Sequence, residues 1–483
     1  VINVQNQGLL LATGGTFTLD GAWQNAGTFA LTNSTFNVNG NYTLANFGTI
    51  NSSNTMVYLN GTLDNRNSIL TLDESKVGWQ LNTVTILGGT IQGVNGVPLT
   101  VAFYGTPTLD GVVLNADLVL NDSADPRVVN GLTFNGTCTL YGGINTTSLN
   151  FDGTQTLAGQ CQINLAGPYD PVVRPVNGTL TIGPKVTIVG GYGIVGRPDL
   201  PLINQGTIRA ENSSRAVQIV GSSVINSGTI VAVSGPIAAD NLQNKGGVSI
   251  APGGTLSLTG AWTNPGTISV TNGTLNVGGT YLKADFTAIQ RHGGTINFNS
   301  VLDNRNDILF LDNNSDNWSL VDGTILGGTV NTATGVHLSL PDSARGKLDG
   351  VIYNGDIVLT MVSKLTITNG LTLNGQVTLA FYSAAIYLDG TQTLSGAGKF
   401  VFEGGVDPFR PRSIVPISGT VTIGASFTIE GGTGTLGNPG LPLVNLGTIS
   451  VDGAGSTITI QGNPFINTGT TLELNGGKVV IVP

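Results

Sequence analysis

Two repeated pairs of carboxylates have the residue type and spacing best suited to chemistry. Asp110 and Asp117 recur as Asp349 and Asp356, in each case 239 residues later. Paired carboxylates on adjacent turns of an elongated fold could cleave a polysaccharide by general acid–base catalysis. Asp110 and Asp349 are each followed by Gly, however, and Asp-Gly is a common turn sequence. Structural corners explain the recurrence more simply than two identical active sites, so we do not expect an enzyme.

The two histidines are the next candidates, as catalytic bases or metal ligands. They are His292 and His337, and the aligned positions in the first half of the chain hold Ser53 and Pro98. Two separated histidines provide neither a multi-histidine metal site nor a recognisable Ser-His-Asp triad. Gly-Gly-x-Gly words resemble calcium-binding coils but lack the Asp that should follow. We expect no metal and no cofactor.

Two cysteines, Cys138 and Cys161, are 23 residues apart and have no counterparts in the second half, where Val377 and Gly398 stand. If the chain coils with a similar period, the two residues would stack at about 4.8 Å, which is within reach of a disulfide. A bridge would indicate an oxidising compartment. Two free buried thiols fit the same spacing, so both interpretations stay open.

Three further features could bind ligands or could be structural. The four tryptophans form two repeat-related pairs, which favours core packing over a glycan platform. The word at residues 63–67 recurs at 302–306 and indicates a turn with a local Asp–Arg pair, with a ligand-binding corner as the alternative. Thr-x-Thr words could order water as in ice-binding arrays, but they do not recur on every coil. The tryptophans are Trp23, Trp79, Trp262 and Trp318.

Composition limits the classes of partner. Only 10% of the 483 residues are charged, and the formal net charge is −9. No Lys/Arg run is present, which argues against a nucleic-acid partner. The apolar runs are too short to span a membrane as a helix. Hydrophobic residues make up 40% of the chain, enough to bury a core. Low charge with many Thr, Ser and Asn residues favours a secreted, extracellular location.

These candidate residues are positioned by a long internal duplication. Gly21-Ala22-Trp23 recurs at Gly260, and Leu109-Asp110-Gly111-Val112 recurs at Leu348, both 239 residues later. Further landmarks keep offsets of 237 to 241. Self-similarity at a fixed period is the signature of repeat architectures. We expect two consecutive repeats, residues 1–239 and 240–483, continuous with each other.

A shorter period of about 20 residues lies inside the long one. The word Asn-x-Gly-Thr followed by an apolar residue marks it, with the Asn interpreted as a corner residue because Asn tolerates left-handed geometry and bonds nearby backbone. In a stacked fold, equivalent Asn side chains could also bond one another along the axis. The corner residues are Asn6, Asn25, Asn46, Asn204, Asn226, Asn244, Asn264, Asn445 and Asn467.

Between the corners, apolar and polar residues alternate with period two, as at residues 16–19, 179–182 and 457–460. This pattern is typical of half-buried strands. A single coil cannot offset the backbone entropy of ordering about 20 residues, so coils must stack. The sequence therefore predicts an all-β fold, a parallel β-solenoid, with the right-handed coil that parallel crossovers favour.

The words Asn-x-Gly-Thr-Ile and Gly-Thr-Leu-x-Leu, repeated at this period, resemble those of bacterial β-strand-repeat surface proteins. That group includes filamentous-haemagglutinin-like adhesins and autotransporter-like passengers. The resemblance covers the whole chain and implies a right-handed parallel β-helix, secretion and a role at the cell surface. It specifies a fold better than a function.

The coil count also suggests self-association. From Asn467 to Pro483 is 16 steps, and six more from the start of another copy reach Asn6, which together make one normal coil. We therefore expect a rigid extracellular rod or filament, built by tandem continuation or by copies stacked end to end. An adhesin shaft that binds glycans or other cells is the alternative, and a polysaccharide-active enzyme is the third.

Overall fold

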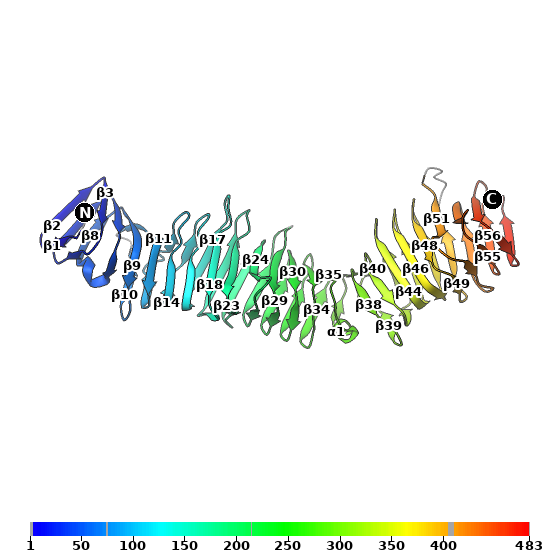
Figure 1. The fold of residues 1–483 in the computed structure, drawn as a ribbon, viewed down its shortest axis with the longest axis horizontal. Helices are drawn as coiled ribbons and strands as arrows, with labels where there is room; N and C mark the ends of the chain where they lie inside the picture. Colours follow the sequence, from blue (N-terminus) through cyan, green and yellow to red (C-terminus); the bar gives the residue numbers. More distant parts are fainter. Residues whose placement is uncertain (1–2, 74–75, 214, 404–409, 483) are drawn as a thin grey trace. The chain divides into compact units, whose positions relative to one another are not determined.

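The computed structural model describes residues 3–73, 76–213, 215–403 and 410–482. Within these ranges the helices are the 3-10 helix η1 (Leu44–Phe47) and the α-helix α1 (Lys283–Thr287), and the other regular elements are β-strands. Strands pair in parallel with strands about 21 residues further along, so that successive coils lie side by side (Figure 1). The predicted all-β parallel β-solenoid is confirmed.

The chain divides into two compact units. Unit 1 comprises Val1–Leu256 with Trp262–Ile268, and unit 2 comprises Ser257–Ala261 with Ser269–Pro483. Each coil contacts chiefly the coils before and after it, as expected for a solenoid.

In unit 1 each regular coil supplies three short strands, and each strand stacks on its equivalent in the next coil. Across residues 172–250 the strands pair without a register shift, as in Leu180↔Leu202↔Val224↔Leu242. The three columns are β21 (Val172–Asn177), β24 (Gly193–Arg197), β27 (Val217–Gly221) and β30 (Pro236–Asp240); β22 (Leu180–Ile182), β25 (Leu202–Asn204), β28 (Val224–Asn226) and β31 (Leu242–Asn244); and β23 (Val186–Gly190), β26 (Thr207–Ala210), β29 (Thr229–Ala232) and β32 (Gly247–Ile250).

Unit 2 has the same plan. Its columns are β48 (Ala385–Asp389), β51 (Arg412–Pro416), β54 (Gly434–Asn438), β57 (Thr457–Gly462) and β60 (Lys478–Val482); β49 (Gln392–Ser395), β52 (Val421–Ile423), β55 (Leu443–Asn445) and β58 (Phe465–Asn467); and β45 (Asp356–Leu359), β47 (Gln376–Leu379), β50 (Lys399–Phe402), β53 (Thr428–Gly431), β56 (Thr448–Asp452) and β59 (Thr470–Leu474).

Two long strands of unit 2, β44 (Arg345–Asn354) and β46 (Lys364–Leu373), cross from one column to the next. The first half of β46 pairs with β48 and its second half with β49. The bend falls at Gly350 and Gly370, whose φ angles are +63° and +88°. Left-handed backbone of this kind favours glycine, so these residues allow the turn without breaking the strand.

The core is a set of apolar stacks along the axis. In unit 1 the register aligns Ile188, Ile208, Ile230 and Val248, and each is no more than 3% exposed. The residues between them face outwards because side chains alternate along a strand. Full burial of each such side chain contributes roughly 1.5–3 kcal/mol, and the backbone ladder between coils satisfies the polar main chain.

Steric crowding between coils explains why the third residue of the Asn-x-Gly-Thr word is glycine. A Cβ on Gly228 would lie 2.2 Å from the carbonyl oxygen of Gly206 one coil earlier, and a Cβ on Gly246 would lie 2.2 Å from that of Gly228. Neither Gly228 nor Gly246 has a positive φ. Glycine is required here because backbones of adjacent coils approach closely, rather than for a left-handed turn.

Candidate functional site

A ladder of buried asparagine side chains runs along the axis of unit 1. Asn204 Nδ2 donates to Asn226 Oδ1, Asn226 Nδ2 to Asn244 Oδ1, and Asn244 Nδ2 to Asn264 Oδ1, each at 2.8 Å. All four side chains are buried. Each donor also reaches a backbone carbonyl of the following coil, as Asn226 does at Gly247. The ladder satisfies polar groups that would otherwise be costly inside an apolar core.

Shorter pieces of the same ladder occur elsewhere. Asn6 donates to Asn25 at 2.7 Å, and Asn445 donates to Asn467 at 2.8 Å. The expected mutual bonding of equivalent Asn side chains is therefore found in both units. The expectation of a left-handed corner at these positions is wrong. None of the nine Asn residues has a positive φ. Seven end a strand, Asn46 lies in η1, and Asn264 directly follows the bridge residue Thr263. Most of the nine side chains are buried.

Asn46 departs from the predicted set. It lies in η1, where Asn46 Oδ1 accepts from the backbone N–H of Thr43 at 2.7 Å, and Asn46 Nδ2 donates to the carbonyl of Trp23. Asn25 consequently donates to the backbone carbonyl of Phe47 at 2.7 Å instead of to another asparagine. Helix η1 interrupts the coil, so Asn46 caps local backbone rather than extending the ladder.

Asn65 and Asn304 are ladder-type asparagines that sequence reasoning assigned to polar turns. Both are fully buried, and each donates at 3.0 Å to a backbone carbonyl of the next coil, that of Thr90 or of Thr329. The signal in the sequence was the recurrence of this Asn at the same place in the two words, residues 63–67 and 302–306.

The side-chain oxygen of this asparagine has different surroundings in the two repeats. In the second, Lys283 Nζ donates to Asn304 Oδ1 at 2.8 Å and to the Ile308 carbonyl at 2.7 Å, and it lies 2.9 Å from a carboxylate oxygen of Asp307. The bond from Lys283 lowers the pKa of Asp307. In the first repeat Leu44 stands at the position of Lys283, and Asn65 Oδ1 has no donor among the described residues.

The predicted local Asp–Arg pairs are confirmed. Arg66 Nε and Nη2 donate to the two carboxylate oxygens of Asp64 at 2.9 and 2.6 Å, and Arg305 donates to Asp303 at the same distances. These hydrogen bonds lower the pKa of Asp64 and of Asp303 to about 2. Both pairs are at the surface, where ion pairs contribute little to stability.

The carboxylates that could have formed an acid–base pair bond to the neighbouring coil instead. Asn130 Nδ2 donates to Asp110 at 2.7 Å, and Asn369 Nδ2 donates to Asp349 at 2.6 Å. The bond from Asn369 is the main reason that the pKa of Asp349 is lowered. These acids therefore serve as links between coils.

The second members of the predicted pairs have the same role. Asp117 accepts from the backbone N–H of Thr137 at 2.7 Å, and Asp356 accepts from that of Gln376 at 2.9 Å. The histidines are exposed on separate strands, His292 in β36 (Gln290–His292) and His337 in β43 (His337–Leu340). Within the described ranges, no group of three or more His, Cys, Asp or Glu residues is arranged to hold a metal ion.

The cysteines are both buried and unbridged in this structure. Cys161 pairs in register with Gly136, and Cys138 pairs with Ile163, so the two cysteines are offset by two residues instead of stacking. Burial raises the pKa of both thiols, that of Cys161 to about 12. The expectation that they stack one coil apart is wrong because β17 (Gly136–Tyr141) and β20 (Cys161–Ala166) pair with a 25-residue step.

The four tryptophans are core residues, as the repeat pairing favoured. Trp262 and Trp318 are 1% exposed, and Trp23 and Trp79 are also buried. Trp318 stacks on Phe298 with ring centroids 5.9 Å apart. None of them is available as a platform for a ligand.

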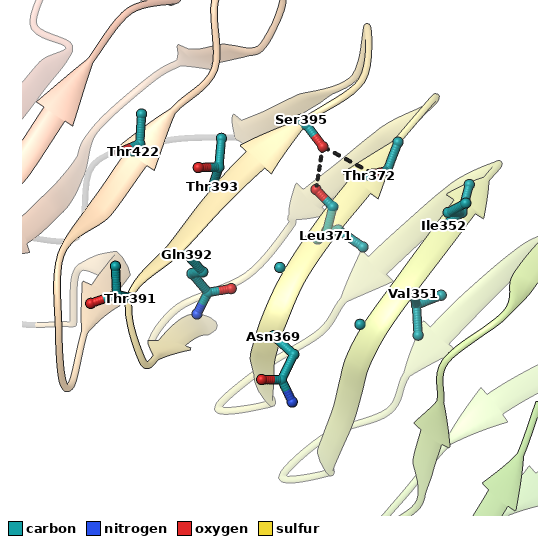
Figure 2. A pocket seen from close by; sticks show the side chains of 12 residues that line it. Val351, Ile352, Asn369, Leu371, Thr372, Thr391, Gln392, Thr393, Ser395 and Thr422 are labelled. Carbon is teal, nitrogen blue, oxygen red and sulfur yellow. Dashed lines mark hydrogen bonds between the residues drawn. The ribbon is translucent and has the colours of Figure 1, made fainter. Parts of the chain in front are cut away.

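A polar hollow on the outer face of unit 2 is the most developed candidate site. It has a volume of about 560 Å³ and crosses β44, β46, β49 and β52 where Gly350 and Gly370 bend their strands. Figure 2 shows its two rims, one formed by Asn369 and Thr391, with the buried Gln392 between them, and the other by Ile352, Thr372 and Ser395.

The floor of this hollow differs between the repeats. Gln392 is 7% exposed, and its Nε2 donates to the carbonyls of Ile367 and Asp389 at 3.0 and 2.9 Å. Its Oε1 has no donor among the described residues. In the first repeat the equivalent Gln155 Oε1 accepts from the backbone N–H of Gly131 at 2.9 Å. Sequence reasoning noted the Thr-x-Thr words around both glutamines but not this hollow.

Comparison with known proteins adds no family. No protein-family model matches the chain, and no curated protein matches it. In the part of the chain that the structure describes, no helix is long and apolar enough to cross a membrane.

Proposed function

We propose that the chain is a structural protein, a segment of a rigid extracellular rod or filament at a bacterial cell surface. The observation that carries this proposal is the buried asparagine ladder from Asn204 to Asn264, enclosed by stacked apolar side chains. A column joined through backbone, core and side chains resists bending, because a bend at any junction between coils must strain all three kinds of contact there.

The corner carboxylates support the same function. Asp110 and Asp349 are engaged by asparagines of the next coil, and Asp117 and Asp356 by backbone N–H groups. Residues that could have served catalysis thus reinforce the column. The low charge and the polar outer positions fit an extracellular setting, as the composition suggested.

Self-association is the second part of the proposal. On the face formed by β58, β59 and β60, Ile481 is 60% exposed and Ile466 is 46% exposed, although Ile481 stacks in register on buried Ile460. A further coil would bury this surface, whether from the same polypeptide or from another copy. Strand β59 is more polar than β60 on the side that continues the core, because Thr471 and Glu473 align with the core residues Ile449 and Val451. A coil stacked there has to accommodate a carboxylate.

Electron microscopy of native material and of purified chain tests the proposal. We expect straight rods in which a tandem of two chains is twice as long as one, and native filaments with an axial repeat of one or two copies. Flexible, beaded particles, or native material with no extended form, would refute a structural column.

A further inference from the structure

The hollow on unit 2 has the chemistry of an uncharged, hydrogen-bonding surface. None of the described residues that line it carries a charged side chain, and hydroxyl and amide groups dominate its rims. Ile352, 42% exposed, adds an apolar contact. Its polar lining residues are Asn369, Thr372, Thr391, Gln392, Thr393, Ser395 and Thr422.

Several of these groups are held in fixed orientations. Both donated bonds of Gln392 Nε2 go to backbone carbonyls, so the amide is held in one orientation, and its buried Oε1 has no donor among the described residues. Thr372 and Ser395 hydroxyl oxygens are 2.9 Å apart and share a hydrogen bond. Asn369 is fixed by its bond to Asp349. Preorganised polar groups lower the entropic cost of binding.

The hollow crosses successive coils, so its polar groups repeat along the stacking axis. Thr372 aligns with Ser395, and Thr393 aligns with Thr422 in the next coil (Figure 2). The step between coils is about 4.8 Å, comparable to the spacing of sugar rings in an extended glycan. A linear chain of rings could therefore present hydroxyls to equivalent groups on consecutive coils.

Other polymers fit less well. Nucleic acids and acidic polysaccharides need cationic side chains, and the described residues lining the hollow include none. An extended peptide binds best at a free sheet edge, but the hollow lies on a face whose strands are already paired on both sides.

We propose that this hollow binds an uncharged glycan, laid along the stacking axis across β44, β46, β49 and β52. Sugar hydroxyls would bond the rim residues Asn369, Thr372 and Ser395, and a ring face would pack on Ile352. This site does not depend on whether the chain forms filaments, because it lies wholly within unit 2.

The test is isothermal titration of the full chain with neutral hexasaccharides, namely cello-, malto-, xylo- and manno-hexaose, and with hexagalacturonate as the acidic comparison. Thr393→Trp fills the hollow from an exposed position. The matched control is Thr156→Trp, at the equivalent position of the first repeat, where Gln155 Oε1 already has a donor. Circular dichroism confirms that each variant is folded.

We expect at least one neutral hexasaccharide to bind the native chain more tightly than hexagalacturonate. Thr393→Trp should weaken that binding by about tenfold or more, and Thr156→Trp should leave it within about twofold. Ser395→Ala, which introduces the first-repeat residue Ala158, should weaken it by a smaller factor. Absence of binding by all four neutral glycans, or equal affinity of the native chain and Thr393→Trp, would overturn the proposal.

Discussion

Asn204 and Asn226, 22 residues apart in the chain, are joined side chain to side chain by a 2.8 Å hydrogen bond in the interior of the column. The same bond joins Asn226 to Asn244 and Asn244 to Asn264. Asn226 and Asn244 therefore each donate to the next asparagine and accept from the previous one. Removing one of these side chains should lower the free energy of unfolding, because its two neighbours lose a hydrogen-bond partner while remaining buried.

Asn226→Ala should therefore destabilise unit 1 by about 1–3 kcal/mol, since Asn204 loses an acceptor and Asn244 loses a donor. Chemical denaturation monitored by circular dichroism measures the change. Gln205→Ala is the control, because it removes an exposed amide next to the ladder. Equal midpoints for the two variants would contradict a stabilising ladder.

Gly228→Ala should destabilise unit 1 by about 1–3 kcal/mol or more, because the new Cβ would lie 2.2 Å from the carbonyl oxygen of Gly206. Gly247→Ala is a matched control in the next coil, with no atom within 4 Å of its Cβ and no positive φ. Thermal melts of both variants test this steric account, which fails if Gly247→Ala is the more harmful change.

Lys283→Leu introduces the residue that the first repeat holds at Leu44. This substitution should lower the free energy of unfolding by about 1–3 kcal/mol, because Asn304 Oδ1 and the Ile308 carbonyl lose their donor. Hydrogen exchange of β38 (Val301–Asp303) and β39 (Ile308–Leu311) should become faster. Lys245→Leu serves as a control lysine on unit 1. Unchanged exchange in β38 and β39 would show that Lys283 does not brace this coil.

The Asp64–Arg66 pair predicts a specific pH dependence. The pKa of Asp64 is lowered from 3.8 to about 2, so the folded state holds this proton less tightly than the unfolded state. Its stabilising effect is therefore complete above about pH 4 and is lost as the pH falls towards 2. Asp64→Asn should lower the melting temperature slightly at pH 7 and by clearly less near pH 2, where about half of the folded molecules have a protonated Asp64. An equal difference at pH 7 and pH 2 would contradict the assignment.

Cys138 and Cys161 should resist alkylation in the folded protein at pH 8, because both thiols are buried and have raised pKa values. Both should react after denaturation. Intact mass with and without a reductant shows whether two hydrogens are lost to a bridge. Rapid labelling of native protein, or a mass that reductant increases, would contradict two free buried thiols.

The sequence alone determined the repeating fold of this protein. Apolar residues at period two and Asn-x-Gly-Thr words at about 20 residues require stacked parallel coils, because no single coil can bury its own core. The mutual bonding of equivalent asparagines and the local Asp64–Arg66 pair also followed from spacing. Such features are readable because they repeat or lie within a few residues of each other.

Only the tertiary structure decided what depends on exact register and on which way a side chain points. Asn46 does not take part in the asparagine ladder because η1 interrupts its coil. Asn65 is buried like the ladder asparagines, although its neighbours in the sequence are polar. Cys138 and Cys161 are offset by two residues in the strand register, because their strands pair with a 25-residue step and the two cysteines are only 23 residues apart. The hollow above Gln392 likewise arises where Gly350 and Gly370 bend adjacent strands, a geometry that becomes visible only when the coils are stacked.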